Sequence, residues 1–526
     1  MNNDTDSGAR RGLTRRQVLV RGTGLTAGAL AGSTFGAAQA WAAPPAAARA
    51  VRDPFTLGVA SGEPAPDGAV LWTRLAPSPL AEDGRGGMPA RSVPVQWQVA
   101  QDERFSRVVA RGTELARPEL GHSVHVEVGG LRPGAEYFYR FKAGPELSPV
   151  GRTKTAPAVG ARVDRLAFAF TSCQDYTSGL FTAHRRMAEE DLDLVVQLGD
   201  YIYEGAANPS QFRVHEGQGE PVSLGGYRNR LAQYKGDADL QAAHAAFPWV
   251  VVLDDHEIDN NWADEVPQDP ARQSREAFLA RRKAALQAYY EHMPLRRASI
   301  PTGIDIQLYR RLAFGDLLDL HVLDTRQYRS DQNTAARLDP SRTILGDEQE
   351  RWLRAALAGR TARWNVLAQQ VFFSERDFTA GTQTSFSDDA WDGYVADRDG
   401  LRDHLATAGT SNPVILTGDV HASYVCDVKA DFDDPASRTV ATELVGTSMT
   451  TGGDGVEQNP GDAVQLAENP HITFINRKRG YVRNTVTASE WTADFRIVDS
   501  VTTPDAPVRT RATFIVEDGR PGAVPA

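Results

Sequence analysis

Five short hydrophobic runs in the second part of the chain each end abruptly in a cluster of polar residues. The runs, with the polar residues that follow them, are Leu166–Phe170 before Thr171-Ser172-Cys173-Gln174, Leu194–Leu198 before Gly199-Asp200, Trp249–Leu253 before Asp254-Asp255-His256-Glu257, Leu317–Leu323 before Asp324-Thr325-Arg326, and Val414–Thr417 before Gly418-Asp419-Val420-His421. Unbroken apolar runs of this length are typical of strands buried on both faces of a parallel sheet. Helical stretches separate them, notably Arg272–Met293 and Gly346–Leu357. The pattern predicts an α/β domain over residues 160–520.

The polar clusters are expected to meet at one edge of that sheet. In open α/β sheets, the ligand site lies beyond the carboxyl ends of the strands. A single Asp at such a position is a common cap or turn residue. Five strand ends that together carry cysteine, histidine and several aspartates instead indicate a site with chemistry.

Residues 54–156 follow a different pattern, with short strands separated by turn signals. Val93–Val99 and Ser123–Val128 alternate with a period of two, and Ala69–Leu75 and Tyr137–Phe141 are further candidate strands. This pattern predicts a small all-β domain, a sandwich of about 100 residues. The segment Leu131–Tyr137 resembles the corner of a fibronectin type III-like or immunoglobulin-like domain.

The first 42 residues have the features of an export signal. Thr14-Arg15-Arg16-Gln17-Val18-Leu19 is similar to the twin-arginine motif, and a weakly apolar stretch follows it. Ala38-Gln39-Ala40 and Ala40-Trp41-Ala42 both offer a small-x-small cleavage pattern. We therefore expect a protein exported in its folded state to the cell envelope or the medium. No later segment is long and apolar enough to predict a membrane span.

Composition narrows the function. The 526 residues carry a formal net charge of −11, which disfavours nucleic-acid binding and suits a protein that attracts cations. The chain has two cysteines, Cys173 and Cys426, so no disulfide framework holds the fold. A single Cys173–Cys426 bridge is the default alternative in an exported protein. The position of Cys173 at a strand end favours a metal-bound thiolate instead.

The residue types at the strand ends predict more than one metal ion. Asp200, Asp255 and Asp419 offer hard oxygen ligands, which suit Ca²⁺, Mg²⁺ or Mn²⁺. A thiolate from Cys173 with a phenolate from Tyr203 suits Fe³⁺ better. Two neighbouring metals can activate water and clamp a phosphate, and an arginine can complete the charge neutralisation. Arg326 is the candidate for that arginine, with an ordinary surface arginine as the alternative.

These motifs resemble one family. Ser172-Cys173-Gln174, Gly199-Asp200-Tyr201-Ile202-Tyr203-Glu204, Asp254-Asp255-His256-Glu257, Asp324-Thr325-Arg326-Gln327-Tyr328-Arg329, Ala390-Trp391-Asp392-Gly393-Tyr394 and Gly418-Asp419-Val420-His421 look like the signature of the PhoD-type alkaline phosphatases. Their order also parallels the purple acid phosphatases. The resemblance implies a metallophosphoesterase-like αββα sandwich, with one ferric ion, two calcium ions and a metal-bound hydroxide or oxo group.

The resemblance also implies a role for each matched position. It implies that Cys173, Tyr203 and His421 bind iron, that Asp200 bridges iron and calcium, and that Asp255 and Asp419 bind calcium, with Asp254 and Asn260 as further calcium ligands. It places His256 near the phosphate and Arg326 in contact with it. The site residues are therefore Arg326 and His256 as catalytic candidates, and the other eight as metal ligands.

The expected activity is hydrolysis of phosphate monoesters and diesters by a secreted, monomeric enzyme. The alternative within the family is a phospholipase D that cleaves phospholipid headgroups with the same metal core. A third hypothesis is an extracellular binding protein with a vestigial catalytic domain. Loss of a metal-ligating residue would support that hypothesis, but Cys173, Asp200 and His421 are all present.

Overall fold

The computed structural model describes residues 53–217, 219–359 and 362–526. The expected export signal, residues 1–42, lies outside them. The strands predicted from the hydrophobic runs are present with small shifts at their ends. The two predicted helices are present as α5 (Arg275–His292) and α6 (Gly346–Ala358). The strands after residue 420 had not been predicted.

The described strands form three sheets. The largest has ten strands in the order β23 (Arg520–Pro525), β22 (Val508–Glu517), β21 (Glu490–Val498), β20 (Gly480–Val486), β9 (Leu166–Thr171), β10 (Leu194–Leu198), β11 (Pro248–Val252), β1 (Val59–Ala65), β2 (Gly68–Arg74) and β5 (Ser123–Val128). Strands β9, β10 and β11 run parallel at its centre. Their carboxyl ends therefore lie at one edge, as predicted for these three strands. The other two strands with polar clusters, which precede Asp324 and Asp419, belong to a second sheet, so the expectation of a single sheet is wrong.

The second sheet has eight strands. They lie in the order β12 (Arg310–Phe314), β13 (Leu318–Val322), β14 (Trp364–Ala368), β15 (Pro413–Thr417), β17 (Thr439–Val445), β16 (Ser423–Lys429), β19 (Ile472–Lys478) and β18 (Gly455–Val456). Strands β13, β14, β15 and β17 are parallel neighbours. An isolated bridge between Ser172 and Ser448 joins the ends of the two sheets beside Cys173.

The third sheet belongs to the N-terminal region. It contains β4 (Val108–Ala116), β3 (Val93–Ala100), β6 (Glu136–Ala143), β7 (Glu146–Leu147) and β8 (Gly151–Lys154). Apolar side chains from this sheet and from β1, β2 and β5 form one buried cluster, so the all-β region packs as two layers. One layer is not self-contained, because β1 pairs with β11 in parallel through Ser61–Pro248 and Gly62–Trp249.

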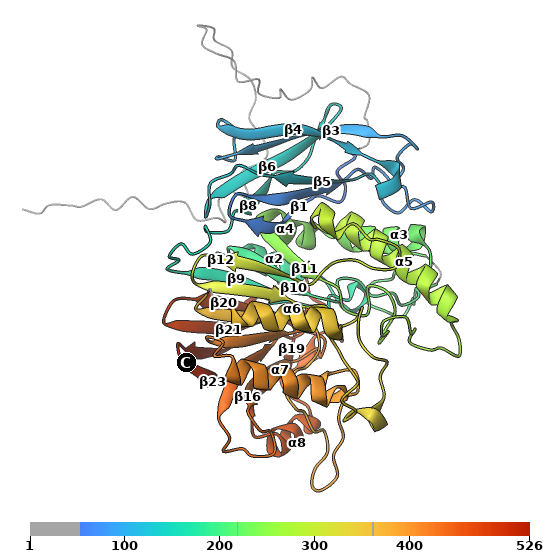
Figure 1. Ribbon diagram of the computed structural model, residues 1–526. Helices are drawn as coiled ribbons and strands as arrows, with labels where there is room; N and C mark the ends of the chain where they lie inside the picture. Colours follow the sequence, from blue (N-terminus) through green and yellow to red (C-terminus); the bar gives the residue numbers. More distant parts are fainter. Residues whose placement is uncertain (1–52, 218, 360–361) are drawn as a thin grey trace, which may run out of the picture.

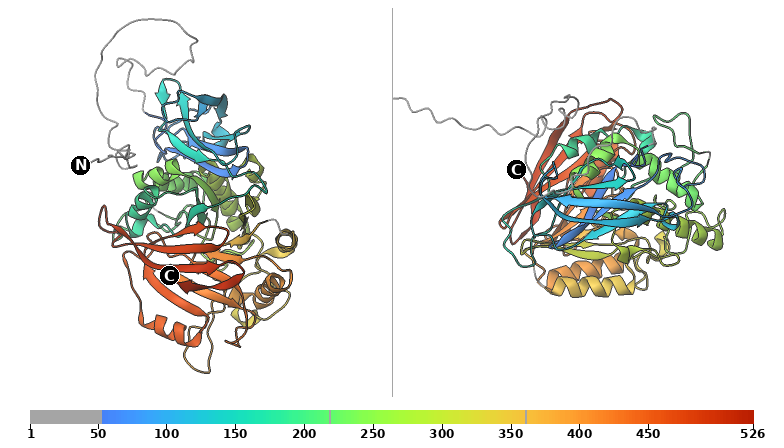
Figure 2. Two further views of the ribbon diagram at one scale, coloured as in Figure 1. Left: turned by 90° about the vertical axis from the view of Figure 1, so that its left-hand side faces the viewer. Right: turned by 90° about the horizontal axis from the view of Figure 1, so that it is seen from above.

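Helices cover the outer faces of the two large sheets. Their bounds are α2 (Thr182–Ala188), α3 (Leu224–Lys235), α4 (Ala238–Ala246), α5, α6, α7 (Val395–Thr407) and α8 (Pro460–Glu468), with short 3-10 turns η1 (Pro118–Leu120), η2 (Tyr176–Ser178), η3 (Arg297–Ser299), η4 (Thr334–Ala336) and η5 (Trp391–Gly393). The N-terminal strands and the C-terminal strands lie at opposite ends of the molecule (Figures 1 and 2).

Side-chain alternation decides which face of the eight-stranded sheet meets which layer. Val366, Val414 and Leu444 join the core shared with β9, β10 and β11. Leu367 and Ile415, on the opposite face, pack with residues of α6 and α7. The two large sheets thus pack face to face, and their loops meet at one edge.

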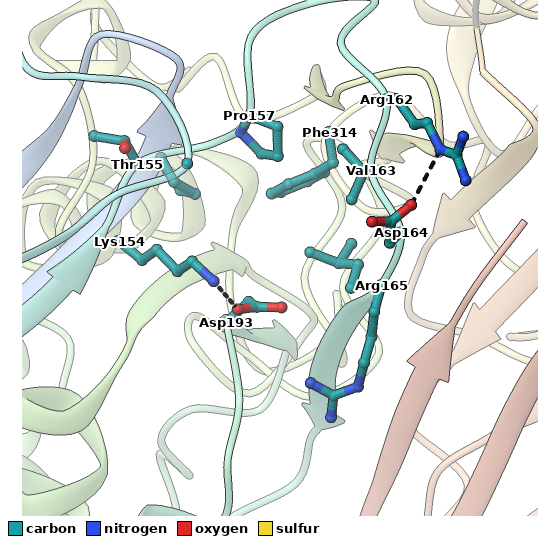
Figure 3. A pocket seen from close by; sticks show the side chains of 12 residues that line it. Lys154, Thr155, Pro157, Arg162, Val163, Asp164, Arg165, Asp193 and Phe314 are labelled. Carbon is teal, nitrogen blue, oxygen red and sulfur yellow. Dashed lines mark hydrogen bonds and ion pairs between the residues drawn. The ribbon is translucent and has the colours of Figure 1, made fainter.

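The junction between the N-terminal region and the rest of the chain has a hollow of its own. Lys154 and Asp193 form an ion pair across it, and Phe314 lies on its apolar side (Figure 3). None of the residues that line it belongs to the strand-end clusters. Among the described residues, no helix has the length and apolar character needed to span a bilayer.

Candidate metal centre

Four of the predicted ligands have strained backbone conformations. Cys173, Asp200, Asp419 and His421 have φ values of 56°, 55°, 59° and 54°, in the left-handed region that non-glycine residues rarely adopt. Each such residue costs on the order of 1–3 kcal/mol unless its surroundings hold it in place, and such residues cluster at functional sites. Cys173, Asp200 and Asp419 each lie two residues after the end of a strand, and His421 lies two residues further along the loop after β15.

Glycines before two of these ligands permit close contact between the loops. Gly199 has φ of +102°, and a Cβ there would overlap the Cβ of Asp254. A Cβ on Gly418 would lie 2.8 Å from the Cβ and the Oγ of Ser172. Glycine at these positions therefore lets the end of β10 approach that of β11, and the end of β15 approach that of β9.

One group of ligands combines sulfur, nitrogen and oxygen. Donor atoms of Cys173, Asp200 and His421 all lie within 4.8 Å of one another. The Tyr203 hydroxyl donates to Oδ2 of Asp200 at 2.9 Å and lies 3.1 Å from Nε2 of His421. The thiol, the phenol, the imidazole and the bridging carboxylate that the sequence predicted are thus one cluster.

A second, purely acidic group lies beside the first. Asp254, Asp255 and Asp419 have carboxylate oxygens within 4.8 Å of one another, and Asp200 forms a further group with Asp255 and His256. Oδ1 of Asp200 and Oδ2 of Asp254 are buried without a hydrogen-bond partner among the described residues, and Oδ1 of Asp255 has only Arg326 at 3.7 Å. Unpartnered buried carboxylate oxygens that face one another are suited to cations. The residues therefore fit metal ions.

The pKa directions show the electrostatic cost of this cluster without a cation. Burial, together with Asp200, raises the pKa of the Cys173 thiol and of the Tyr203 phenol well above their usual ranges. Burial, with Asp389 and Asp255, raises the pKa of Asp419 to about 7. A bound cation has the opposite effect on such groups, because it favours their charged forms.

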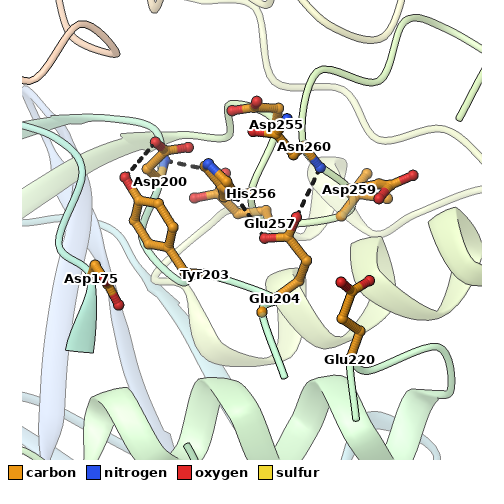
Figure 4. A network of polar contacts seen from close by, with 12 residues as sticks. Asp175, Asp200, Tyr203, Glu204, Glu220, Asp255, His256, Glu257, Asp259 and Asn260 are labelled. Carbon is orange, nitrogen blue, oxygen red and sulfur yellow. Dashed lines mark hydrogen bonds and ion pairs between the residues drawn. The ribbon is translucent and has the colours of Figure 1, made fainter. Parts of the chain in front are cut away.

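His256 lies at the more open side of the site. Its Nδ1 lies 2.7 Å from Oε2 of Glu204, and its side chain is 19% exposed. Burial lowers its pKa, but Asp255 and Glu204 outweigh burial, so the pKa of His256 is raised well above its ordinary value. The contact with Glu204 engages Nδ1 of the ring, as Figure 4 shows.

Arg326 does not have the environment expected of a phosphate-binding residue. Its side chain is 0% exposed. Its Nε donates to Asp254 at 2.6 Å, and its two terminal nitrogens donate to Asp389 at 2.6 and 2.8 Å. Each of its nitrogens thus has a carboxylate acceptor, and direct contact with a phosphate stays a prediction. The surface position considered as the alternative is wrong, because the residue is fully buried.

The remaining predictions concern Asn260 and the two cysteines. Asn260 lies at the same edge, where its backbone N–H donates to Oε1 of Glu204 at 2.9 Å. Cys173 and Cys426 are both buried and free, so the alternative of a disulfide is not realised. Cys426 lies within β16, where its side chain joins a separate apolar cluster.

Two family models match the chain, and together they span most of it. The model described as PhoD-like phosphatase matches residues 168–495. The chain belongs to the PhoD-like phosphatase family. A model for the N-terminal domain of PhoD-like phosphatases matches residues 38–157.

Two relatives of this PhoD-like phosphatase support the assignment along nearly its whole length. Alkaline phosphatase D of Bacillus subtilis (strain 168) is 50% identical over an alignment of 524 residues, which covers 96% of this chain and 88% of that protein. A solved structure described as "Structure of PhoD" is 51% identical, with a TM-score of 0.88, and the match covers 91% of this chain and 93% of the other. This PhoD-like phosphatase is a hydrolase that acts on phosphoric ester bonds.

Several residues that shape the site of this PhoD-like phosphatase were not assigned from sequence. Glu257 accepts N–H bonds from Asp200 at 3.3 Å and from Asp254 at 2.8 Å, so it ties two ligand loops together. Asp389 binds Arg326 and Arg329. Glu257 stands inside a motif that resembles the family's, and Asp389 directly precedes another. That adjacency was the only available signal.

Two further residues approach the site from the C-terminal part of the chain. The Thr451 hydroxyl lies 2.9 Å from the Tyr203 oxygen and 2.8 Å from the Cys173 carbonyl. Arg479 donates to the His421 carbonyl at 2.7 Å. Neither position carries a motif, so only the tertiary structure identifies them.

Proposed function

We propose that the protein is an exported alkaline phosphatase and phosphodiesterase that depends on Fe³⁺ and Ca²⁺. The observation that carries this proposal is the set of unpartnered, buried carboxylate oxygens beside a thiol, a phenol and an imidazole. Hard oxygens suit Ca²⁺, and thiolate with phenolate suits Fe³⁺. When bound, the ions would supply Lewis-acid activation of a phosphate ester and a water of low pKa.

The chain's own residues have distinct roles in this proposal. Cys173, Tyr203 and His421 would hold the iron, and Asp200 would lie between the two kinds of metal. Asp254, Asp255, Asn260 and Asp419 would hold calcium. His256 would donate a hydrogen bond from Nε2 to the ester, while Glu204 fixes its ring through Nδ1.

Arg326 has a positioning role in our proposal. Its bonds to Asp254 and Asp389 hold these carboxylates in place and offset part of their negative charge. A fixed arginine between two carboxylates keeps ligand oxygens oriented before a metal binds. We therefore propose that Arg326 acts on the carboxylates of the site rather than on the phosphate.

The proposal includes features of fold and location. We propose that the facing sheets correspond to the αββα sandwich of metallophosphoesterases, over residues 160–520, and that residues 54–156 form a fibronectin type III-like domain. We also propose that the enzyme acts as a monomer and is exported through a twin-arginine signal in residues 1–42.

Metal analysis of the purified protein, joined to a substrate panel, tests the proposal. Iron and calcium are expected together, a calcium chelator is expected to abolish activity, and added Ca²⁺ is expected to restore it. Nitrophenyl phosphate and bis-nitrophenyl phosphate are expected to be hydrolysed faster than phosphatidylcholine. Full activity in excess chelator would refute the calcium assignment, and a preference for phosphatidylcholine would favour a phospholipase D.

Export is tested separately. Replacing both Arg15 and Arg16 with Lys is expected to leave the full-length precursor inside the cell. Processing and secretion at the normal level would refute the twin-arginine assignment without affecting the proposed chemistry.

A further inference from the structure

The proposed function leaves the phosphoryl group without an arginine from the chain, because Arg326 is engaged by carboxylates. Another buried cation, Arg376, lies after the end of β14, which is the parallel neighbour of the strand that precedes Asp419. It follows β14 in the second sheet, in a segment that carried no motif in the sequence. The inference below rests on the proposed function and adds a substrate-binding residue to it.

Arg376 is enclosed by aromatic rings. Its Cζ lies 4.2 Å from the centre of the Phe372 ring, 4.8 Å from that of Phe378 and 5.4 Å from that of Tyr424. The residue is only 7% exposed. Rings on several sides hold a guanidinium through cation–π contacts, but they accept none of its strong in-plane hydrogen bonds.

Among the residues that the structure describes, none accepts a hydrogen bond from the guanidinium of Arg376. Within residues 53–217, 219–359 and 362–526, the only hydrogen bond of Arg376 to a side chain is donated by its backbone N–H to Asp392. Every other buried arginine of these segments donates from its side chain to at least one acceptor; these are Arg74, Arg228, Arg230, Arg281, Arg282, Arg326, Arg329, Arg398 and Arg479. The guanidinium nitrogens of Arg376 are not among the fully enclosed polar atoms that lack a partner, so they are open to solvent and to an anion from outside the chain. A cation that is held by rings and open to solvent is suited to bind an anion.

The location of Arg376 specifies which anion. Tyr424, one of its rings, lies three residues after His421, and Phe372 packs edge to face against Tyr424 at 5.1 Å. The Phe372 carbonyl accepts the N–H of Trp391, two residues after Asp389. The arginine therefore lies beside the loop that carries two proposed metal ligands.

We infer that Arg376 binds the non-bridging oxygens of the substrate's phosphoryl group and of the phosphate product. A guanidinium presents parallel N–H groups that match two oxygens of one phosphate. Its charge-assisted bonds strengthen as negative charge develops during phosphoryl transfer. The aromatic rings hold the side chain without competing for its donors, so the site is oriented before the substrate arrives. Phe378, 39% exposed, forms the outer wall of this position.

Phosphate affinity and turnover of matched variants test this role. The metal-loaded wild type, Arg376→Ala, Arg376→Lys and Arg376→Met are compared by kcat/KM for nitrophenyl phosphate and by the inhibition constant of inorganic phosphate. For Arg376→Ala, both are expected to worsen on the order of 100-fold, because a charged donor to the reacting group is lost. Arg376→Lys is expected to be intermediate, since it keeps the charge but loses the fork.

The matched control is Arg337→Ala. Arg337 also stacks on a ring, that of Phe386 at 3.9 Å, but its Nε donates to the Asp392 carbonyl at 3.0 Å. The Arg337→Ala variant removes a ring-stacked arginine from the same neighbourhood. It is expected to leave the inhibition constant of phosphate unchanged. Arg376→Met keeps the packing volume, so it is measured if Arg376→Ala does not fold. Iron and calcium contents and the thermal midpoint are recorded for each variant.

The possible results separate the inference from the proposed function. If the wild type is active and fully loaded, and phosphate inhibits a folded, metal-loaded Arg376→Ala or Arg376→Met within about twofold of wild type, Arg376 does not bind phosphate. If the variants lose metal in proportion to their activity, Arg376 supports the metal site and the inference is again wrong. A wild type that lacks iron and calcium overturns the proposed metal centre instead.

Discussion

At the scale of single residues, the site is defined by polar groups that are buried at high cost. Cys173 illustrates this, because its thiol is fully buried beside Asp200 and Tyr203 rather than in an apolar core. Cys426 offers a natural comparison. It is equally buried, yet it packs against apolar side chains in β16 and its cluster contains no proposed ligand.

The two cysteines are therefore expected to respond differently to the same change. Cys173→Ser should lose iron, the visible absorption expected of an iron–phenolate pair, and most activity. Cys426→Ser should keep all three. Metal content, absorbance and turnover of the two variants are the measurements, and equal behaviour of the pair would contradict a thiolate ligand at Cys173.

Arg326 should matter for stability as well as for activity. Arg326→Met leaves Asp254 and Asp389 facing each other without their shared cation, and removing one partner of a buried ion pair costs about 3–5 kcal/mol. The free energy of unfolding in urea is the measurement. Arg354→Met is the control, because its half-exposed pair with Glu350 should contribute less than about 1 kcal/mol. A similar loss in both variants would contradict the buried network.

At the scale of secondary structure, the strands deliver ligands because their ends turn sharply. Strand β10 ends at Leu198, and Gly199 then passes so close to Asp254 that the two loops share one space. The group of Asp200, Asp255 and His256 thus depends on β10 and β11 being adjacent and parallel. The turn residue is as important as the ligands that flank it.

Gly199→Ala is expected to lower the free energy of unfolding by about 2–4 kcal/mol, from the positive φ and the overlap with Asp254. It should also lower metal content. Gly205→Ala is the matched control, since nothing lies within 4 Å of a Cβ at that position. Chemical denaturation and metal analysis check both variants. Unchanged metal content in Gly199→Ala would mean that the loops can separate without losing the site.

At the scale of the whole molecule, the N-terminal region is part of the framework of the catalytic sheet. Strand β1 pairs with β11, the indole of Trp72 donates to the Glu291 carbonyl at 3.0 Å, and His125 stacks on Tyr290 at 4.4 Å. Glu63 also forms an ion pair with Arg310. The all-β region thus covers an edge strand that would otherwise be exposed.

Removal of this region is expected to prevent folding. A chain that begins at Ala158 should expose the β11 edge and the apolar surface around Trp249, and it should accumulate as aggregate. A chain that begins at Asp53, which removes only the undescribed N-terminal segment, should be soluble and active. Solubility and size-exclusion profiles distinguish the two. A monomeric, active chain from Ala158 would show that the catalytic region is independent.

The sequence by itself determined the strands that carry the ligands and the kinds of atom they offer. A hydrophobic run that is followed closely by Asp, Cys or His is a local feature of the sequence. Parallel neighbouring strands end at a common edge, so such runs predict where their polar residues gather. Periodicity also revealed the all-β region. It did not reveal that β1 extends the main sheet, because strand pairing depends on distant partners rather than on the local pattern.

Only the tertiary structure showed what surrounds the two arginines and that Glu257 and Asp389 belong to the site. Arg326 and Arg376 both lie in loops that follow strands. Their positions in the sequence do not predict which groups surround the guanidinium. Three carboxylates lie around the guanidinium of Arg326. Aromatic rings lie around that of Arg376, and no described residue accepts a hydrogen bond from it. These neighbours come from segments far apart in the chain. Burial and hydrogen-bond satisfaction are properties of the packed molecule, so a residue's type and position could not decide them.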